Sequence, residues 1–199
     1  LPLLDLPSSK RRPDVKTHNG RTVVTYFNEE LTSKLKNYAL EREGTLFMGI
    51  MSALKALLYR YTGQEDLILG ASIAGRTHSD LEIQIGFYIN ALALRSEISG
   101  RDSFDNVYQK VRHTILEAYT HQVYPFDRLV EELEQSRLTS RSAVFDIMVV
   151  LQNAGEKIQD LLIPKERIND IIEYERRTCI YDIKFDFEEE GNYLRLLVE

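Results

Sequence analysis

The amino-acid sequence predicts an α/β sandwich in which helices pack on a mixed sheet. Two observations indicate this fold class: helical and strand-like segments alternate along the chain, and three continuous apolar runs are short enough to be interior strands. Such an order places helices over a mostly buried sheet. The composition agrees, because 43% of the 199 residues are hydrophobic and 28% are charged, as in a globular domain or one lobe of a larger domain.

Residues 1–19 differ in composition from the rest of the chain. Pro2, Pro7 and Pro13 stand among Ser, Lys and Arg residues, and prolines at this density disfavour helix. We expect an extended surface linker over residues 1–19, followed by one folded unit over residues 20–199. Because the sequence begins with Leu1 and no signal-like region follows, we also expect that it was cut from a longer chain.

The first part of the folded unit predicts one strand and two helices. β-branched and aromatic residues from Thr22 to Phe27 indicate a strand. Apolar residues at helical spacing indicate a helix over Glu30 to Arg42, with Gly44 as its left-handed stop. Thr45 can cap a second helix, which has little polar surface and ends at Gly63.

The middle of the chain predicts two interior strands and two more helices. Leu67 to Ile73 is a short apolar run, and Ile83 to Arg95 is a second one after a loop over Ala74 to Glu82. Ser103 can cap a helix that carries one apolar stripe. Pro125 stands where a short amphipathic helix can begin, since the first turn leaves its missing N–H unpaired anyway.

The last third predicts three strands. Phe145 to Gln152 is the third interior run. Cys179 to Glu188 and Tyr193 to Val198 flank a Gly-Asn turn and are expected to pair as a hairpin. Cys179 is the only cysteine, and in a strand it is interpreted as a small buried apolar residue, because a reactive thiolate needs exposed, electropositive surroundings.

Charge and motif content exclude several classes of protein. With 31 acidic and 25 basic side chains the formal net charge is -6, so the chain lacks the basic field that nucleic-acid binding relies on. No apolar run reaches the ~18 residues of a membrane span. We therefore expect no nucleic-acid or membrane partner and, since one cysteine cannot form an internal disulfide, a cytoplasmic protein. The sequence has no CxxC or HExxH motif, and we expect no metal site.

Four histidines are the candidates for an acid–base residue. His18 lies in the first segment, and His113 and His121 would stand about 12 Å apart along one helix, too far to share a metal or a proton. His78 lies in the loop from Gly75 to Asp80, where a turn could present it to a cleft, so it is the best placed of the four. The residues alone do not identify an enzyme.

Three segments carry motifs whose order and separation resemble the condensation domains of nonribosomal peptide synthetases. Ile85 to Arg95 is similar to the pattern IGxFvNTlxlR, with Tyr88 and Ala91 as departures. His121 to Asp127 looks like HQdlPFe, and Ser140 to Asn153 resembles sRnPLFqvmfvlqN. Two less specific segments agree, namely Gly63 to Asp66 with sGqeDi and Leu69 to Arg76 with vGtpvaGR.

This resemblance implies one lobe of a two-lobed domain, with each lobe related to chloramphenicol acetyltransferase. The family joins an acyl or peptidyl thioester to the amine of an aminoacyl thioester, and both substrates ride on phosphopantetheine arms of carrier domains. Its HHxxxDG motif belongs to the N-terminal lobe, and this sequence has no adjacent histidine pair and no HxxxD. The chain is therefore identified as a C-terminal lobe without catalytic residues, inactive when isolated, that supplies substrate-channel and carrier-docking surfaces.

The resemblance also implies partners and site residues. We expect contacts with the N-terminal lobe, the upstream and downstream peptidyl carrier domains and an adjacent adenylation domain, and no directly bound cofactor. Asn90, Tyr88 and Gly86 are expected to line the substrate channel. The Asn90 amide can either bond backbone or face the channel, and the resemblance favours the channel. Structural or docking roles are expected for five residues: Arg76, His78, Arg141, His121 and Asp127.

Two alternatives remain open. The first is a free-standing acetyltransferase-like trimer with its site between subunits, in which His78 would serve as the base. The second is a noncatalytic scaffold that only docks carrier domains. An HHxxxDG motif upstream of Leu1 would favour the condensation enzyme over the scaffold.

Overall fold

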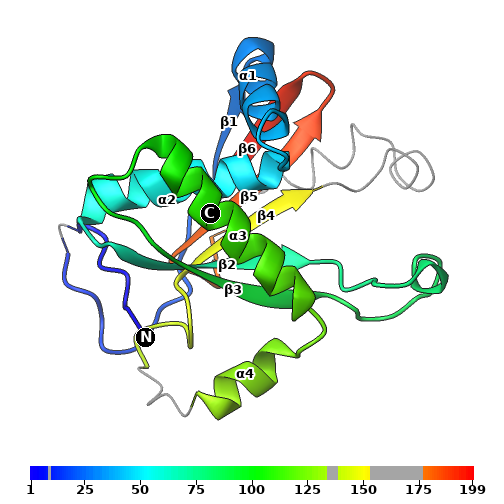
Figure 1. The fold of residues 1–199 in the computed structure, drawn as a ribbon. Coiled ribbons are helices and arrows are strands. Elements are labelled where there is room, and N and C mark those ends of the chain that lie inside the picture. The colour runs from blue at the N-terminus through cyan, green and yellow to red at the C-terminus, as the bar shows by residue number, and fades with distance from the viewer. Residues whose placement is uncertain (9, 134–138, 153–176) are drawn as a thin grey trace.

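Within the described residues, the sheet has six strands in the order β1-β6-β5-β4-β2-β3 (Figure 1). The computed structural model describes residues 1–8, 10–133, 139–152 and 177–199. The strands are β1 (Val23–Phe27), β2 (Asp66–Ile73), β3 (Asn90–Glu97), β4 (Ile147–Gln152), β5 (Ile183–Glu190) and β6 (Tyr193–Val198). The helices are α1 (Glu29–Leu40), α2 (Leu46–Thr62), α3 (Phe104–Thr120) and α4 (Phe126–Glu132), with one 3-10 turn, η1 (Ser79–Leu81). β4 pairs in parallel with β2 and β5, and the other pairs are antiparallel, so the sheet is mixed as predicted.

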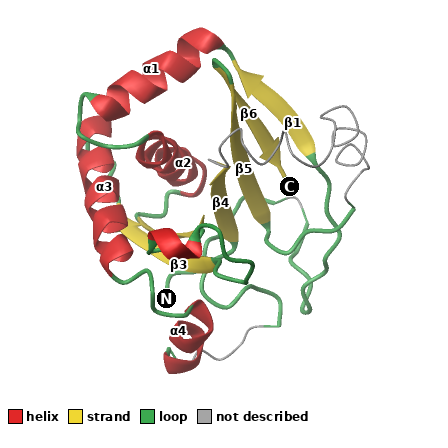
Figure 2. Ribbon diagram, turned by 90° about the vertical axis from the view of Figure 1, so that its right-hand side faces the viewer, coloured by secondary structure: helices red, strands yellow, loops and turns green. Residues whose placement is uncertain are grey.

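Helices α1, α2 and α3 cover one face of the sheet, as Figure 2 shows. The main core lies between these layers, where α2 and α3 contribute Met51 and Val111 and β2 contributes Leu69, all fully buried. A smaller cluster lies on the other face, where Phe126 of α4 packs against Phe145 with 5.2 Å between the ring centroids. The predicted α/β sandwich is confirmed.

The helix ends follow from local chemistry. The Thr45 hydroxyl accepts a hydrogen bond from Met48 N at 3.3 Å, and Gly63 ends α2 with φ of 68°. The predicted left-handed stop at Gly44 is wrong, because the residue with positive φ is Glu43 at 54°. Gly44 is needed for a different reason: a Cβ at this position would overlap the hydroxyl of Tyr108.

The interior strand predicted over Ile83 to Arg95 is wrong in its first half. β3 begins at Asn90, and residues 74–89, here called the arm, extend beyond the sheet as a loop that carries η1 (Figure 1). Ile85 and Phe87 lie in the arm with 105% and 91% of their surface exposed. A continuous apolar run predicts buried side chains. Ile85 and Phe87 are instead exposed to solvent in the described structure.

Two other predicted strands begin later than expected. β4 starts at Ile147, and Phe145 and Asp146 precede it as buried residues of a loop. β5 starts at Ile183, so the prediction of Cys179 inside a strand is wrong. The thiol is half-buried beside Gly20, close enough that a Cβ on that glycine would crowd it.

Residues 1–8 and 10–19 contain no helix, and contacts fasten them to the folded body. Leu4 and Leu6 pack against the main core. The guanidinium of Arg12 pairs with the carboxylate of Asp182, just before β5. Polar and apolar contacts together therefore hold this segment along the folded body.

Lys55 is a fully buried lysine at the centre of α2. Its Nζ donates to three neutral acceptors: Leu67 O at 3.1 Å, Leu94 O at 2.7 Å and Ser96 Oγ at 3.0 Å. These bonds join α2 to the β2–β3 pair. Burial lowers the pKa of Lys55 to about 7, because the charged form loses its hydration without gaining a paired carboxylate.

We expect the free energy of unfolding to rise between about pH 7 and pH 9 because of Lys55. The folded-state pKa is about 7, whereas an unfolded lysine titrates near 10.4, so in this range the unfolded chain binds more protons than the folded one. The slope from this group approaches but does not exceed about 1.4 kcal/mol per pH unit, the value for one proton. Urea unfolding of the wild type and of Lys55→Met at several pH values measures it. Equal slopes in the two proteins would contradict this assignment.

Candidate functional site

A cavity of about 580 Å³ opens at the carboxyl ends of β2 and β4. These strands are parallel neighbours, and ligands of α/β proteins commonly bind where such strands end. Ser72, Ile73, Val150, Leu151 and Gln152 line it from the strands. Its other sides come from the arm, through Ala74, Arg76, Gly86, Tyr88 and Ile89, and from Phe47 of α2 and Tyr119 of α3. Two of the three predicted channel residues, Tyr88 and Gly86, therefore lie on this cavity.

Arg76 holds the arm in a fixed shape. Its Nη1 donates to Gln84 O at 2.9 Å and also to Leu81 O. The guanidinium lies over the ring of Tyr88, 4.6 Å from the centroid, and the Tyr88 hydroxyl donates to Gln84 Oε1 at 2.9 Å. Arg76 thus bonds carbonyls within the arm, which is a structural arrangement.

Two glycines allow the two sides of the arm to approach each other. Gly75 has φ of 64°, and a Cβ there would overlap the Tyr88 carbonyl oxygen. A Cβ on Gly86 would lie 2.7 Å from Cε2 of the Tyr88 ring. A side chain at Gly75 or Gly86 would collide with Tyr88. The two glycines therefore allow Tyr88 to take its position on the cavity wall.

Asn90 lies at the first position of β3, outside the cavity lining. Its Nδ2 donates to Gln122 O at 3.0 Å and Tyr124 O at 2.7 Å, and its Oδ1 accepts from Phe126 N at 3.1 Å. The amide thus fastens the turn before α4 to the sheet. This is the backbone-bonding alternative, and a contact between Asn90 and a substrate stays a prediction.

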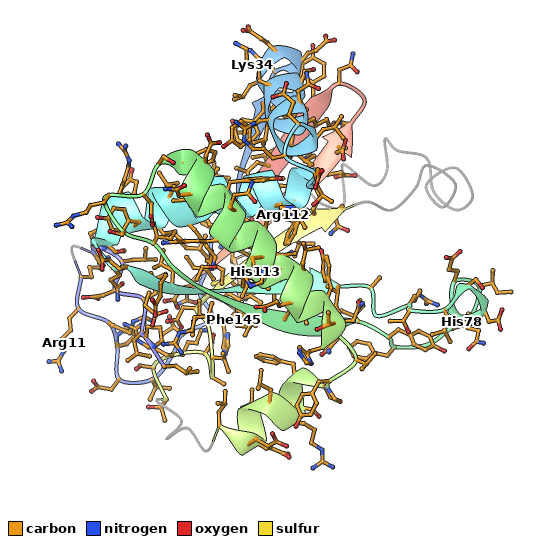
Figure 3. All side chains as sticks on the ribbon, in the orientation of Figure 1. Arg11, Lys34, His78, Arg112, His113 and Phe145 are labelled. Atoms are coloured by element: carbon orange, nitrogen blue, oxygen red, sulfur yellow. The ribbon has the colours of Figure 1, made fainter. Side chains whose placement is uncertain are left out.

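The histidines lie away from the cavity. Figure 3 shows His78 on the arm, far from the helices, and its side chain is 68% exposed. Its Nδ1 accepts a hydrogen bond from Asp80 N at 3.2 Å, which caps η1. His121 is exposed at the end of α3, and Asp127 is exposed in α4, where its Oδ1 accepts from Arg128 N at 3.0 Å.

Arg141 lies in the loop before β4 and is nearly buried. Its Nη1 donates to Asp146 Oδ2 and to Leu4 O, both at 2.6 Å. The other carboxylate oxygen of Asp146 accepts from Ser142 N at 3.2 Å. Arg141 therefore ties the first segment to the loop that carries the last motif. The final residue of that motif, Asn153, lies outside the described residues.

The described lining of the cavity holds few groups that could act as an acid or base near neutral pH. Its lining contains no histidine, cysteine, lysine or carboxylate among the described residues. Burial raises the pKa of Tyr119, so its phenol stays protonated near neutral pH. In the described part of the chain, no three His, Cys, Asp or Glu side chains meet as metal ligands would. No helix in that part is long and apolar enough to cross a bilayer.

Comparisons with known proteins agree with the motifs. The family model described as Condensation domain matches residues 1–199. A linear gramicidin synthase protein of Brevibacillus parabrevis is 40% identical over 197 residues, which are 97% of this chain and 2% of that protein. Bacitracin synthase 1 of Bacillus licheniformis is 37% identical over 199 residues, which are 100% of this chain and 4% of that protein. The chain thus spans a small part of these relatives.

Two solved structures share the fold. The crystal structure of a four-domain nonribosomal peptide synthetase bound to AMP and glycine superposes with a TM-score of 0.82 at 22% identity, over 98% of this chain and 16% of that one. The X-domain from teicoplanin biosynthesis gives 0.80 at 20% identity, over 98% of this chain and 45% of that one. The family match covers the whole sequence, and the chain belongs to the condensation-domain family.

Proposed function

We propose that this chain is the C-terminal lobe of a condensation domain and provides one wall of the substrate channel of a nonribosomal peptide synthetase. The observation that carries the proposal is the cavity, which is lined by the motif residues Arg76, Gly86 and Tyr88 and has no histidine, cysteine, lysine or carboxylate among its described residues. The coverage supports a half-domain, because the chain spans 45% of the X-domain structure. The names of the gramicidin and bacitracin synthases support a place in peptide-antibiotic biosynthesis.

In the proposed reaction an amine attacks a thioester carbonyl. The C–N bond forms, the carbon–sulfur bond breaks to release the thiol of the pantetheine arm, and a base carries the amine proton to the departing sulfur. That base would come from the HHxxxDG motif of the N-terminal lobe, while this lobe orients the two substrates. Carrier domains would bring both thioesters on phosphopantetheine arms, and an adjacent adenylation domain would activate the amino acid.

The exposed apolar residues of the arm support the N-terminal lobe as a binding partner of this chain. Ile83, Ile85 and Phe87 are each at least 91% exposed, and they lie within five residues of one another. Arg76 holds this segment folded, so the apolar side chains are presented on an ordered support. Exposed apolar side chains of this kind are typical of a protein interface, and the arm is the proposed contact with the N-terminal lobe.

The test is whether the chain associates with that lobe. We expect chain 1–199 alone to sediment as a monomer and, mixed with the separately produced N-terminal lobe, as a 1:1 complex. A stable trimer of the chain alone would favour the free-standing acetyltransferase, and thioester cleavage lost in His78→Ala would then support His78 as its base. Carrier binding without any association with the N-terminal lobe would favour the scaffold.

A further inference from the structure

The cavity has an apolar half and a polar half, and strand geometry produces the division. Successive side chains of a strand point to opposite faces. Ile73 and Leu151 therefore share the helix-covered face, where Phe47 of α2 and Tyr119 of α3 also line the cavity. Ser72, Val150 and Gln152 belong to the other face, which therefore contributes two polar side chains and one apolar one.

The apolar half is backed by the main core. Phe47, Ile73 and Leu151 are partly buried and pack against the core cluster between the sheet and the helices. Because packed cores deform little, these side chains form a wall of fixed shape. Tyr119, a residue that is 36% exposed, completes the wall. A ligand group placed here would lose water on its apolar surface, which is favourable only for an uncharged group.

The polar half has hydrogen-bonding groups that are not used within the described residues. The Ser72 hydroxyl makes no hydrogen bond within the described residues. Gln152 uses its Nε2 on Asp186 Oδ1 at 3.2 Å, which leaves its Oε1 as an acceptor. These groups suit the amides of an aminoacyl ligand. Arg76 is the one charged residue among the described lining, and its Nη1 is already bonded to two carbonyls of the arm.

We infer that the cavity selects an aminoacyl substrate whose side chain is apolar, aliphatic or aromatic, and rejects charged ones; this inference rests on the proposed function. The side chain would lie against Phe47, Tyr119 and Leu151, and the amide portion would face Ser72 and Gln152. A lysine side chain would meet no carboxylate on the described lining, so its charge would lose hydration without a partner.

The test uses chain 1–199 and hydrolysis-resistant amides of aminoacyl pantetheine with leucine, phenylalanine, lysine or aspartate, together with pantetheine alone. Isothermal titration should show the leucine and phenylalanine probes binding at least about tenfold more tightly than the two charged probes. Tyr119→Lys should reduce the preference for the apolar probes over the aspartate probe at least about tenfold, and Ile89→Lys is a second variant on the arm side of the cavity. Leu116→Lys is the matched control, because Leu116 is 41% exposed on the same helix and does not line the cavity.

The outcomes separate the apolar preference from the channel role. Equal affinity for the four aminoacyl probes, or tightest binding of a charged one, would overturn the apolar preference and leave a channel role in place. The preference is likewise overturned if Tyr119→Lys and Ile89→Lys both fold and bind like wild type. If neither pantetheine nor any aminoacyl probe binds to chain 1–199 or to its 1:1 complex with the N-terminal lobe, the channel role itself is overturned.

Discussion

Asp146→Ala is expected to lower the free energy of unfolding by about 3–5 kcal/mol, the cost of removing one partner of a buried ion pair. The side chains of Arg141 and Asp146 are 12% and 5% exposed, and their atoms lie 2.6 Å apart. Without the carboxylate, the Arg141 charge stays buried with the Leu4 carbonyl as its acceptor among the described residues, and Ser142 N loses its acceptor. Urea unfolding followed by circular dichroism measures the change.

Two further variants make this expectation specific. Glu30→Ala removes the Lys34–Glu30 pair, whose side chains are 69% and 72% exposed, and it should cost about 0.5 kcal/mol or less. The double variant Arg141→Met/Asp146→Leu removes both charges. Its free energy of unfolding should be closer to that of the wild type than the value for Asp146→Ala. If Asp146→Ala lowered the free energy of unfolding no more than Glu30→Ala, the Arg141–Asp146 pair would not be holding the first segment to the loop before β4.

Replacing Ile85 and Phe87 together by aspartate is expected to weaken association with the N-terminal lobe at least about 100-fold. Each side chain should contribute about 1.5–3 kcal/mol if the partner buries it, and about 1.4 kcal/mol corresponds to a tenfold change in Kd. Both are at least 91% exposed in this chain, so their loss should leave its own stability nearly unchanged. Titration of one lobe against the other measures the affinity.

Leu40→Asp is the matched control for the arm. Leu40 is 73% exposed at the end of α1, which lies well away from the arm (Figure 1). We expect this variant to bind the N-terminal lobe like wild type. Equal binding by Leu40→Asp and by the arm variant would mean that the arm does not carry the contact between lobes.

Most helices and strands could be predicted from the sequence because local signals determine them. Thr45, Ser103 and Gly63 mark helix ends, and the described bonds and dihedral angles show them in these roles. The arm could not be predicted. Its apolar run has the composition of a buried strand, and periodicity cannot distinguish side chains that enter a core from those that face outward.

The site depended on tertiary structure in a similar way. The motifs pointed to Tyr88 and Gly86, which line the cavity, and to Asn90, which bonds backbone instead. The cavity itself joins the ends of β2 and β4, the arm and two helices, and no local pattern records that these segments meet. Lys55 was missed because one lysine in an apolar helix ordinarily reaches solvent, whereas here three acceptors hold it inside.

We propose that this chain takes part in amide formation only together with an N-terminal lobe. The most direct measurement mixes chain 1–199 with a separately produced lobe that carries HHxxxDG and with two loaded carrier domains, and then detects peptide by mass spectrometry. We expect product from the mixture and none from either lobe alone. Product from chain 1–199 alone, or no product from a mixture that forms the 1:1 complex, would contradict the claim.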